Sequence, residues 1–202
     1  MASASVPEPI TPAAALEVAR PRGIRLSERR LGKLEVRGDP ADRAFMATVG
    51  RTLDLLLPTE PNTTAGRGDL VALWLGPDAW LLTCPPGALA AHSDSLRRAL
   101  SDVHAAVTDV SDGRVALRLA GPNARDVLVK GCPLDLHPSI FATGSCAQSI
   151  LAKTSVLLHL PDDTAQRGPT FDLYVGRSFA YYLWTWLEDA GQEYGVQVEA
   201  AA

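Results

Sequence analysis

The sequence predicts an α+β fold with two intimately packed lobes of mostly antiparallel sheet and helices. Alternating apolar residues, as at 115–119, indicate strands with one buried face. Strands and single amphipathic helices follow one another without a strict strand–helix–strand repeat, which argues against a parallel sheet. Each half of the chain has a strand pair, a helix and a return strand. We therefore expect one domain at residues 23–202, with lobes at about 23–104 and 105–202.

The chain begins with an arm, a strand and a helix. Residues 1–22 are rich in Ala, Pro and Ser, and we expect them to be extended. Apolar residues alternate with charged ones at 34–36, which predicts a strand. Asp39 is expected to cap a helix that has Pro40 in its first turn and ends at Gly50.

A hairpin and a second helix complete the first lobe. After a polar loop at 61–68, apolar runs at 70–75 and 79–83 flank a Gly-Pro-Asp turn, which predicts two paired strands. The Pro-Pro pair at 85–86 introduces a helix with one leucine-rich side.

The second lobe starts with a short strand at 106–110 and the alternating strand at 115–119. Pro122 opens a short helix, where its missing N–H costs nothing, and Gly131 ends that helix. An irregular loop is expected at 133–144.

The C-terminal part contains the strongest helical pattern. Residues 148–160 predict one long strand or half of a hairpin, and 161–169 predict a polar surface loop. Ser178 is expected to cap a helix that ends at Gly191. Further strands are expected at 171–175 and 196–198. The helix would bury a stripe made of Phe179, Tyr182, Leu183, Trp186, Leu187 and Ala190.

The composition argues against several kinds of partner. The 202 residues are 47% apolar, which is enough for one compact core. The net charge is −4 and no basic face is interleaved with aromatics, so we expect no nucleic acid partner. Apolar runs are shorter than a membrane span, and no signal sequence is recognisable. We therefore expect no membrane partner and a cytoplasmic location.

Cysteine and histidine patterns do not favour a metal site. Cys84, Cys132 and Cys146 form no CxxC motif, and their odd number argues against a disulfide framework. Cys132, His137 and Cys146 could together bind a metal ion, but buried reduced thiols are the favoured interpretation.

Catalytic patterns are equally weak. His104, Asp109 and Ser111 are close in sequence, but no nucleophile elbow occurs, and turn roles are favoured for the aspartates. Glycine-rich phosphate loops are also absent from the sequence. We therefore expect no catalytic, cofactor-binding or metal-binding residue on this chain.

One segment carries a family resemblance. Residues 108–131 contain Asp-x-Ser-Asp, a strand and then Ala-Gly-Pro-x-Ala-Arg-x-Val-Leu. This order is similar to the central segment of the folate-binding aminomethyltransferase (T-protein) family of glycine cleavage. The segments 170–175 and 183–195 resemble that family's next strand and helix. The resemblance implies a T-protein-like fold from about residue 70 to residue 195.

A second resemblance is more specific. The motifs at 75–82, 130–137 and 177–184 resemble the gamma subunits of heterotetrameric sarcosine oxidases. That resemblance implies a subunit of an alpha–beta–gamma–delta complex that oxidises sarcosine, transfers the one-carbon unit to tetrahydrofolate, and makes glycine and hydrogen peroxide. It also implies that FAD, FMN, NAD, zinc and tetrahydrofolate are bound by the alpha, beta and delta subunits. N-methylglutamate dehydrogenase has a similar small subunit, and an independent folate-dependent one-carbon transferase or folate binder is the other alternative.

The chain departs from the T-protein pattern where that family binds folate. The family's Gly-Tyr-Thr-Gly-Glu loop corresponds to 158–169, where only Gly168 remains of the loop glycines. Asp172 matches the family's acidic position and is interpreted as a surface or sheet residue. Residues 82–86 offer no carboxylate for proton transfer. We therefore expect a non-catalytic subunit.

Subunit contacts are the remaining candidate function of the surface. Tyr181 and Trp184 lie off the expected core stripe of the last helix, so they predict a subunit interface or cover by a second layer of the same domain. The arm, Leu134 and His137 are further interface candidates, with an ordinary loop role as the alternative.

Overall fold

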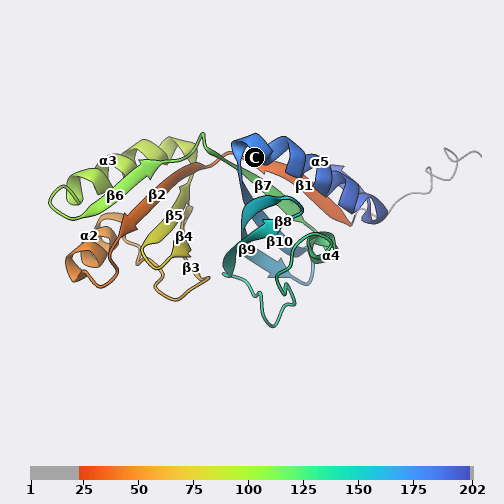
Figure 1. Ribbon diagram of the computed structural model, residues 1–202, viewed down its shortest axis with the longest axis horizontal. Helices are drawn as coiled ribbons and strands as arrows, with labels where there is room; N and C mark the ends of the chain where they lie inside the picture. The colour runs from red at the N-terminus through yellow and green to blue at the C-terminus, as the bar shows by residue number, and fades with distance from the viewer. Residues whose placement is uncertain (1–22, 201–202) are drawn as a thin grey trace, which may run out of the picture.

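In the computed structural model, residues 23–200 form two sheets that lie side by side, each with helices on one face (Figure 1). The strand orders are β3-β4-β5-β2-β6 and β11-β1-β7-β10-β9-β8. Every pair of neighbouring strands is antiparallel except β1 with β11. The predicted α+β class with mostly antiparallel sheet is confirmed. The predicted arm at 1–22 lies outside the described residues.

The five-stranded sheet and its two helices form one lobe. Its strands are β2 (Gly32–Gly38), β3 (Thr64–Arg67), β4 (Leu70–Gly76), β5 (Ala79–Cys84) and β6 (Ala105–Asp109). Its helices are α2 (Arg43–Leu53) and α3 (Leu89–Ala99), the latter preceded by a 3₁₀ turn, η1 (Pro86–Ala88). Phe45 and Val49 of α2 and Leu96 of α3 pack on this sheet's outer face.

The six-stranded sheet forms the other lobe. Its strands are β1 (Ile24–Arg29), β7 (Arg114–Ala120), β8 (Cys146–Leu151), β9 (Thr154–Thr164), β10 (Gly168–Gly176) and β11 (Val196–Val198). Its helices are α4 (Ala124–Val129) and α5 (Ala180–Gly191), with 3₁₀ turns η2 (Arg177–Phe179) and η3 (Gln192–Tyr194) around α5. Within residues 23–200, no helix combines the length and apolar character needed to cross a membrane.

The first strand, β1, belongs to the lobe built by the C-terminal strands. Ile24 and Leu26 are fully buried in the core beneath α5, and Gly191 leaves room for Ile24. A Cβ atom at Gly191 would lie 2.3 Å from Ile24 Cδ1. After β1 the chain crosses to β2 in the five-stranded sheet, and it returns to the six-stranded sheet only after β6. The boundaries between the two lobes therefore lie near residues 30 and 110, whereas the sequence predicted one boundary at about 104/105.

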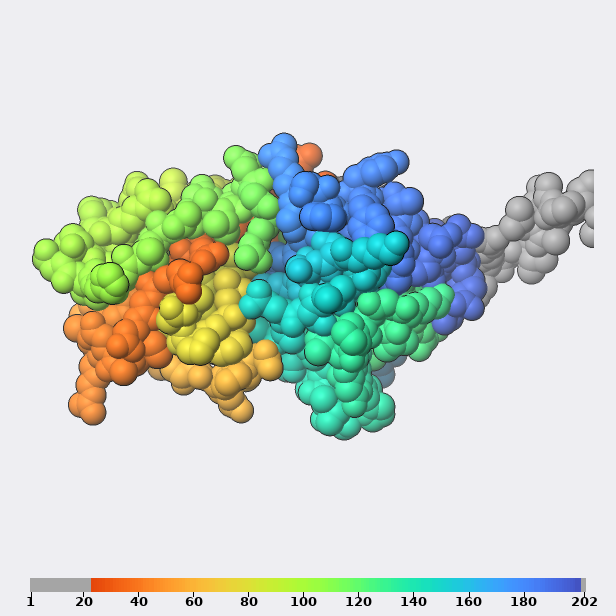
Figure 2. Space-filling view, viewed as in Figure 1, coloured from red at the N-terminus to blue at the C-terminus, as the bar shows by residue number. Residues whose placement is uncertain are grey.

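The inner faces of the two sheets pack against each other. Leu73 and Leu81 from the five-stranded sheet meet Leu157 and Tyr174 from the six-stranded sheet, and all four are buried. A backbone bridge between Thr63 and Ser145 also joins the two lobes. In the space-filling view the two lobes touch along the upper and middle parts of the boundary that faces the viewer (Figure 2).

The start of α2 differs from the expectation. Asp42, not Asp39, is the N-cap, and its Oδ1 accepts a hydrogen bond from Ala44 N at 2.8 Å. Asp39 instead closes the preceding turn by accepting from Ala41 N at 2.8 Å. The helix continues past Gly50 because Asp54 supplies the left-handed residue that ends it, with φ of 49°.

The start of α5 also differs from the expectation. Ser178 lies inside η2, and the helix has no side-chain cap. Four residues of the expected stripe do face the core, since Leu183 and Leu187 are buried and Trp186 and Ala190 pack partly on the same core. Phe179 and Tyr182, expected in the core, are 48% and 36% exposed.

Two expected loops are largely strand. Residues 161–169, expected to be a surface loop, extend the β9–β10 hairpin as far as the pair Thr164–Gly168. Gly168 has a φ of +70°, and a Cβ there would lie 2.6 Å from Pro122 N, so this hairpin packs tightly on the Gly121–Pro122 turn. Similarly, β3 occupies half of the expected loop at 61–68.

We expect the contact between the sheets to dominate stability. Leu81→Ala removes a side chain that is fully buried between the two sheets and should lower the free energy of unfolding by about 2–5 kcal/mol. Urea unfolding followed by circular dichroism measures this change. Leu56→Ala is the matched control, since Leu56 is 73% exposed and its loss should change stability by less than about 0.5 kcal/mol. Equal effects of both substitutions would contradict the expectation.

Candidate functional site

A row of polar side chains crosses the inner face of the six-stranded sheet. Arg118 on β7 pairs in register with Asp172 on β10, and Asp172 pairs with His159 on β9. The row continues to Ser27 on β1 and Cys146 on β8. Because alternate residues of a strand point to opposite faces, the neighbours of these residues, such as Leu117 and Leu173, fill the core under the helices instead.

Asp172 is the centre of this row. Its side chain is 2% exposed and accepts two hydrogen bonds from Arg118, Nε to Oδ1 at 2.7 Å and a terminal nitrogen to Oδ2 at 2.8 Å. Arg29 Nη1 donates a third hydrogen bond, to Oδ2, at 3.1 Å. Two guanidinium groups therefore hold one buried carboxylate, which leaves it poorly placed to accept a proton from a ligand.

His159 is the second unusual group in the row. The residue is 5% exposed, and its Nδ1 has no hydrogen-bond partner among the described residues. Burial lowers the pKa of His159 to about 4, and the Arg118 and Arg29 charges act in the same direction against the opposing pull of Asp172. His159 is therefore neutral near pH 7.

A small cavity of about 210 Å³ opens beside these residues. It lies between the sheets, and its polar lining includes Arg29, Asp69, Thr83, His159 and Asp172. Tyr174 also lines it, and burial raises the pKa of the Tyr174 hydroxyl, which keeps that group protonated. The cavity thus offers a paired carboxylate, a neutral imidazole and a neutral phenol.

Comparison with known proteins decides the family. The family model described as "Sarcosine oxidase, gamma subunit family" matches residues 37–193. The chain belongs to this family. The sarcosine oxidase subunit gamma of Corynebacterium sp. (strain U-96) is 34% identical over 185 residues, covering 89% of this chain and 85% of that protein. The subunit gamma from Arthrobacter sp. is 37% identical over 130 residues, covering 64% of this chain and 61% of that protein.

Two solved structures share the fold. A chain of the heterotetrameric sarcosine oxidase from Corynebacterium sp. U-96, in complex with pyrrole 2-carboxylate, aligns with a TM-score of 0.78 and 32% identity, covering 94% of this chain and 97% of that one. The glycine cleavage system aminomethyltransferase T from Bartonella henselae aligns with a TM-score of 0.64 and 15% identity, covering 93% of this chain and 50% of that one. The T-protein-like fold is therefore confirmed, and so is the resemblance to sarcosine oxidase gamma subunits.

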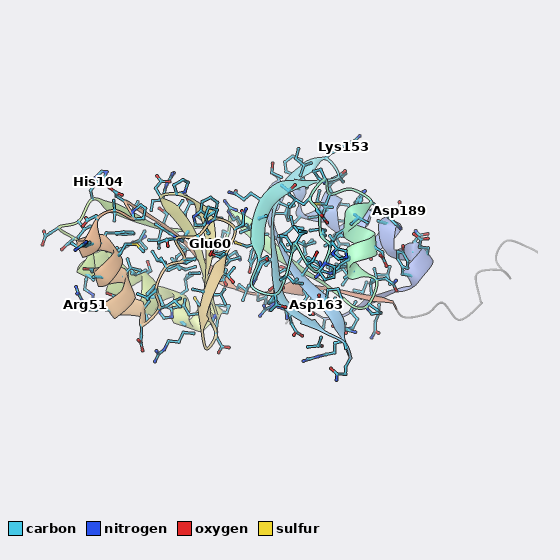
Figure 3. All side chains as sticks on the ribbon, turned by 90° about the horizontal axis from the view of Figure 1, so that it is seen from below. Arg51, Glu60, His104, Lys153, Asp163 and Asp189 are labelled. Carbon is cyan, nitrogen blue, oxygen red and sulfur yellow. The ribbon has the colours of Figure 1, made fainter. Side chains whose placement is uncertain are left out.

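The turn residues of this gamma family member have structural partners. Asp109 Oδ1 accepts from Ser111 N at 2.9 Å, and Ser111 Oγ accepts from Lys33 N at 2.9 Å. The Ser111 hydrogen bonds hold the pKa of Asp109 below its usual range. His104 lies at the far end of the five-stranded lobe (Figure 3), and no contact joins it to Asp109 or Ser111. The three residues are not assembled as a triad.

The three cysteines are free and buried. Burial raises the pKa of Cys146 to about 11 and also raises the pKa of Cys84, which makes both thiols poor nucleophiles. Within residues 23–200, no group of three or more His, Cys, Asp or Glu side chains is arranged to hold a metal ion.

The interface candidates fall into two separate places. Tyr181 is 83% exposed, and with the half-buried Trp184 it lines a groove of about 420 Å³ between α5 and the sheet. Leu134 packs partly on the core, and His137 is exposed on the loop that follows α4. Neither Leu134 nor His137 lines the Tyr181 groove.

Arg125 is a structural residue whose role the sequence did not reveal. From α4 it donates to the carbonyl oxygens of Leu136 and Phe141 and, at 2.7 Å, to Asp163 Oδ2 on the β9–β10 hairpin. Its guanidinium also lies 5.4 Å from the centroid of the Phe171 ring. This one side chain ties the irregular loop after α4 to the sheet. The one feature of the sequence that singles out Arg125 is its place in the Ala-Gly-Pro-x-Ala-Arg motif.

The buried imidazole predicts a specific loss of stability in acid. In the unfolded chain His159 ionises near its ordinary pKa of 6.5, whereas in the folded chain its pKa is about 4. The unfolded state therefore binds the proton first as pH falls, and the resulting loss is about 2 kcal/mol at pH 5 relative to pH 7. His159→Leu should remove this part of the pH dependence. Urea unfolding of both proteins at pH 7, 6 and 5 tests it, and parallel pH profiles would contradict it.

Proposed function

We propose that the chain is a non-catalytic subunit that supports assembly of a heterotetrameric sarcosine oxidase. The observation that carries the proposal is the state of Asp172, the acidic residue at the T-protein position. Its carboxylate is buried and held by Arg118 and Arg29 instead of facing a ligand. A member of the gamma subunit family with this arrangement keeps the fold and lacks the proton-transfer group.

The rest of the proposed complex follows from the family. The partners would be alpha, beta and delta subunits, which would carry FAD, FMN, NAD, zinc and the tetrahydrofolate site. The complex would convert sarcosine to glycine, with transfer of the one-carbon unit to tetrahydrofolate and release of hydrogen peroxide. We also propose a cytoplasmic location, which cell fractionation would test.

Two alternatives remain as proposals of lower rank. The small subunit of an N-methylglutamate dehydrogenase-type complex is one, because an assembly role would leave the same marks on this chain. An independent folate-dependent one-carbon transferase or folate binder is the other. The small polar cavity beside Asp172 is the observation that keeps it open.

Binding measurements separate the folate alternative from an assembly role. Isothermal titration of the purified chain with tetrahydrofolate should show no saturable binding up to about 1 mM, since Asp172 is already paired. The protein should also have no visible flavin absorbance. Submicromolar tetrahydrofolate binding would favour the folate binder and sink the non-catalytic role.

The exposed aromatic side chains near α5 are the proposed subunit contact. Phe179, Tyr181 and Tyr182 are all at least 36% exposed, and Trp184 lines the adjoining groove. Aromatic residues anchor protein interfaces because they bury a large area at low entropic cost. Leu134 and His137 are a second proposed contact, on the loop that Arg125 holds in place.

The aromatic contact can be tested in the assembled complex. Tyr181→Ala together with Trp184→Ala should raise the dissociation constant of this subunit at least about tenfold, while the fold survives because Tyr181 is 83% exposed. Native mass spectrometry of the co-purified complex over a dilution series measures this. Leu56→Ala, an exposed position in the other lobe, is the control and should leave assembly unchanged. An intact complex for the double variant across the series would exclude this surface as the contact.

A further inference from the structure

A second pocket lies where the chain passes between the two lobes. It has a volume of about 330 Å³ and is built from the β1–β2 connection, the β6–β7 turn and the start of η2. Both crossings of the chain therefore contribute to it. Arg29 and Leu31 separate it from the smaller cavity beside Asp172, because they line both spaces.

The pocket concentrates positive charge in a chain whose net charge is −4. Its basic lining residues are Arg29, Arg30, Lys33, Arg114 and Arg177, and its acidic ones are Glu28 and Asp112. Of these basic residues, only Arg29 forms an ion pair within residues 23–200. Arg114 on β7 pairs with Gly176 on β10, and Arg177 follows Gly176 directly in the chain, so the two arginines are neighbours.

Lys33 forms the buried wall of this pocket. The residue is 4% exposed, yet its Nζ has one hydrogen-bond acceptor within the described chain, the carbonyl oxygen of Leu31 at 2.8 Å. An ammonium group has three donors, so two lack a protein partner. Burial lowers the pKa of Lys33, while the charges of Asp109, Asp112 and Glu28 oppose that shift. A buried cation with spare donors beside a cavity indicates a place for an anion.

We propose that this pocket binds a phosphate group, free or carried by a small hydroxylated molecule. Arginine forks match phosphate oxygens in pairs, and lysine adds a point charge, so Arg114, Arg177 and Lys33 together supply the donors that a phosphate requires. Glu28 and Asp112 at the same pocket can accept hydrogen bonds from hydroxyl groups and would repel a long polyanion. The ligand would touch both crossings between the lobes.

Titration calorimetry on the full chain, at fixed ionic strength, tests the proposal with two probes, inorganic phosphate and ribose 5-phosphate. Both should bind saturably, and Arg114→Gln with Arg177→Gln should weaken binding at least about tenfold. Tighter binding of ribose 5-phosphate identifies a phosphate ester as the ligand, and equal binding identifies phosphate alone. Ribose without phosphate should not bind.

Two further variants make the result decisive. Lys33→Met removes the buried ammonium and should reduce affinity at least about tenfold, with folding checked by circular dichroism. Arg51→Gln removes an exposed arginine on α2, far from the junction of the lobes (Figure 3), and should change nothing. The proposal fails if neither probe binds below about 10 mM, or if Arg51→Gln weakens binding as much as the pocket variants do.

Discussion

The contact between the inner faces of the two sheets is the constraint on which the rest of the structure depends. Leu73 and Leu81 meet Leu157 and Tyr174 there, and Asp172 is buried beside this contact. On a solvated sheet this carboxylate would be hydrated, and its attraction to arginine would be weak. The apolar contact between the sheets and the ion pairs of Asp172 therefore depend on each other. The sheets that bury the leucines also bury the carboxylate, and burial strengthens its attraction to the arginines.

This arrangement shows how the acidic side chain of a T-protein-like fold is satisfied inside the domain. A buried acid needs either a ligand or a permanent counter-charge. In this chain Arg29 and Arg118 provide the counter-charge from neighbouring strands. The charge of Asp172 is therefore compensated by side chains of the same domain.

The sequence predicted elements well where local patterns decide them. Strands β4 and β5 follow from alternating apolar residues around a Gly-Pro-Asp turn. The predicted face of α5 is correct at Leu183 and Leu187 but too wide, because Phe179 belongs to the preceding 3₁₀ turn and Tyr182 lies at the exposed edge of the stripe. The partners of Asp172 lie 54 and 143 residues away, so no motif could place them. The sequence identifies Asp172 as the residue at the family's acidic position and predicts a surface or sheet residue. Only the register of β7, β9 and β10 shows that its side chain is buried and paired.

The position of β1 determines the order in which the lobes can form during synthesis. All strands of the five-stranded sheet leave the ribosome before β7, whereas β1 lies between β7 and β11. The six-stranded sheet can close only when Val196–Val198 have emerged, and such distant pairing forms slowly. Among the strands at residues 23–200, β1 is synthesised first and obtains its last neighbour, β11, at the very end. Until β11 pairs with it, β1 is an unpaired edge of the six-stranded sheet, and unpaired edges favour association with other strands.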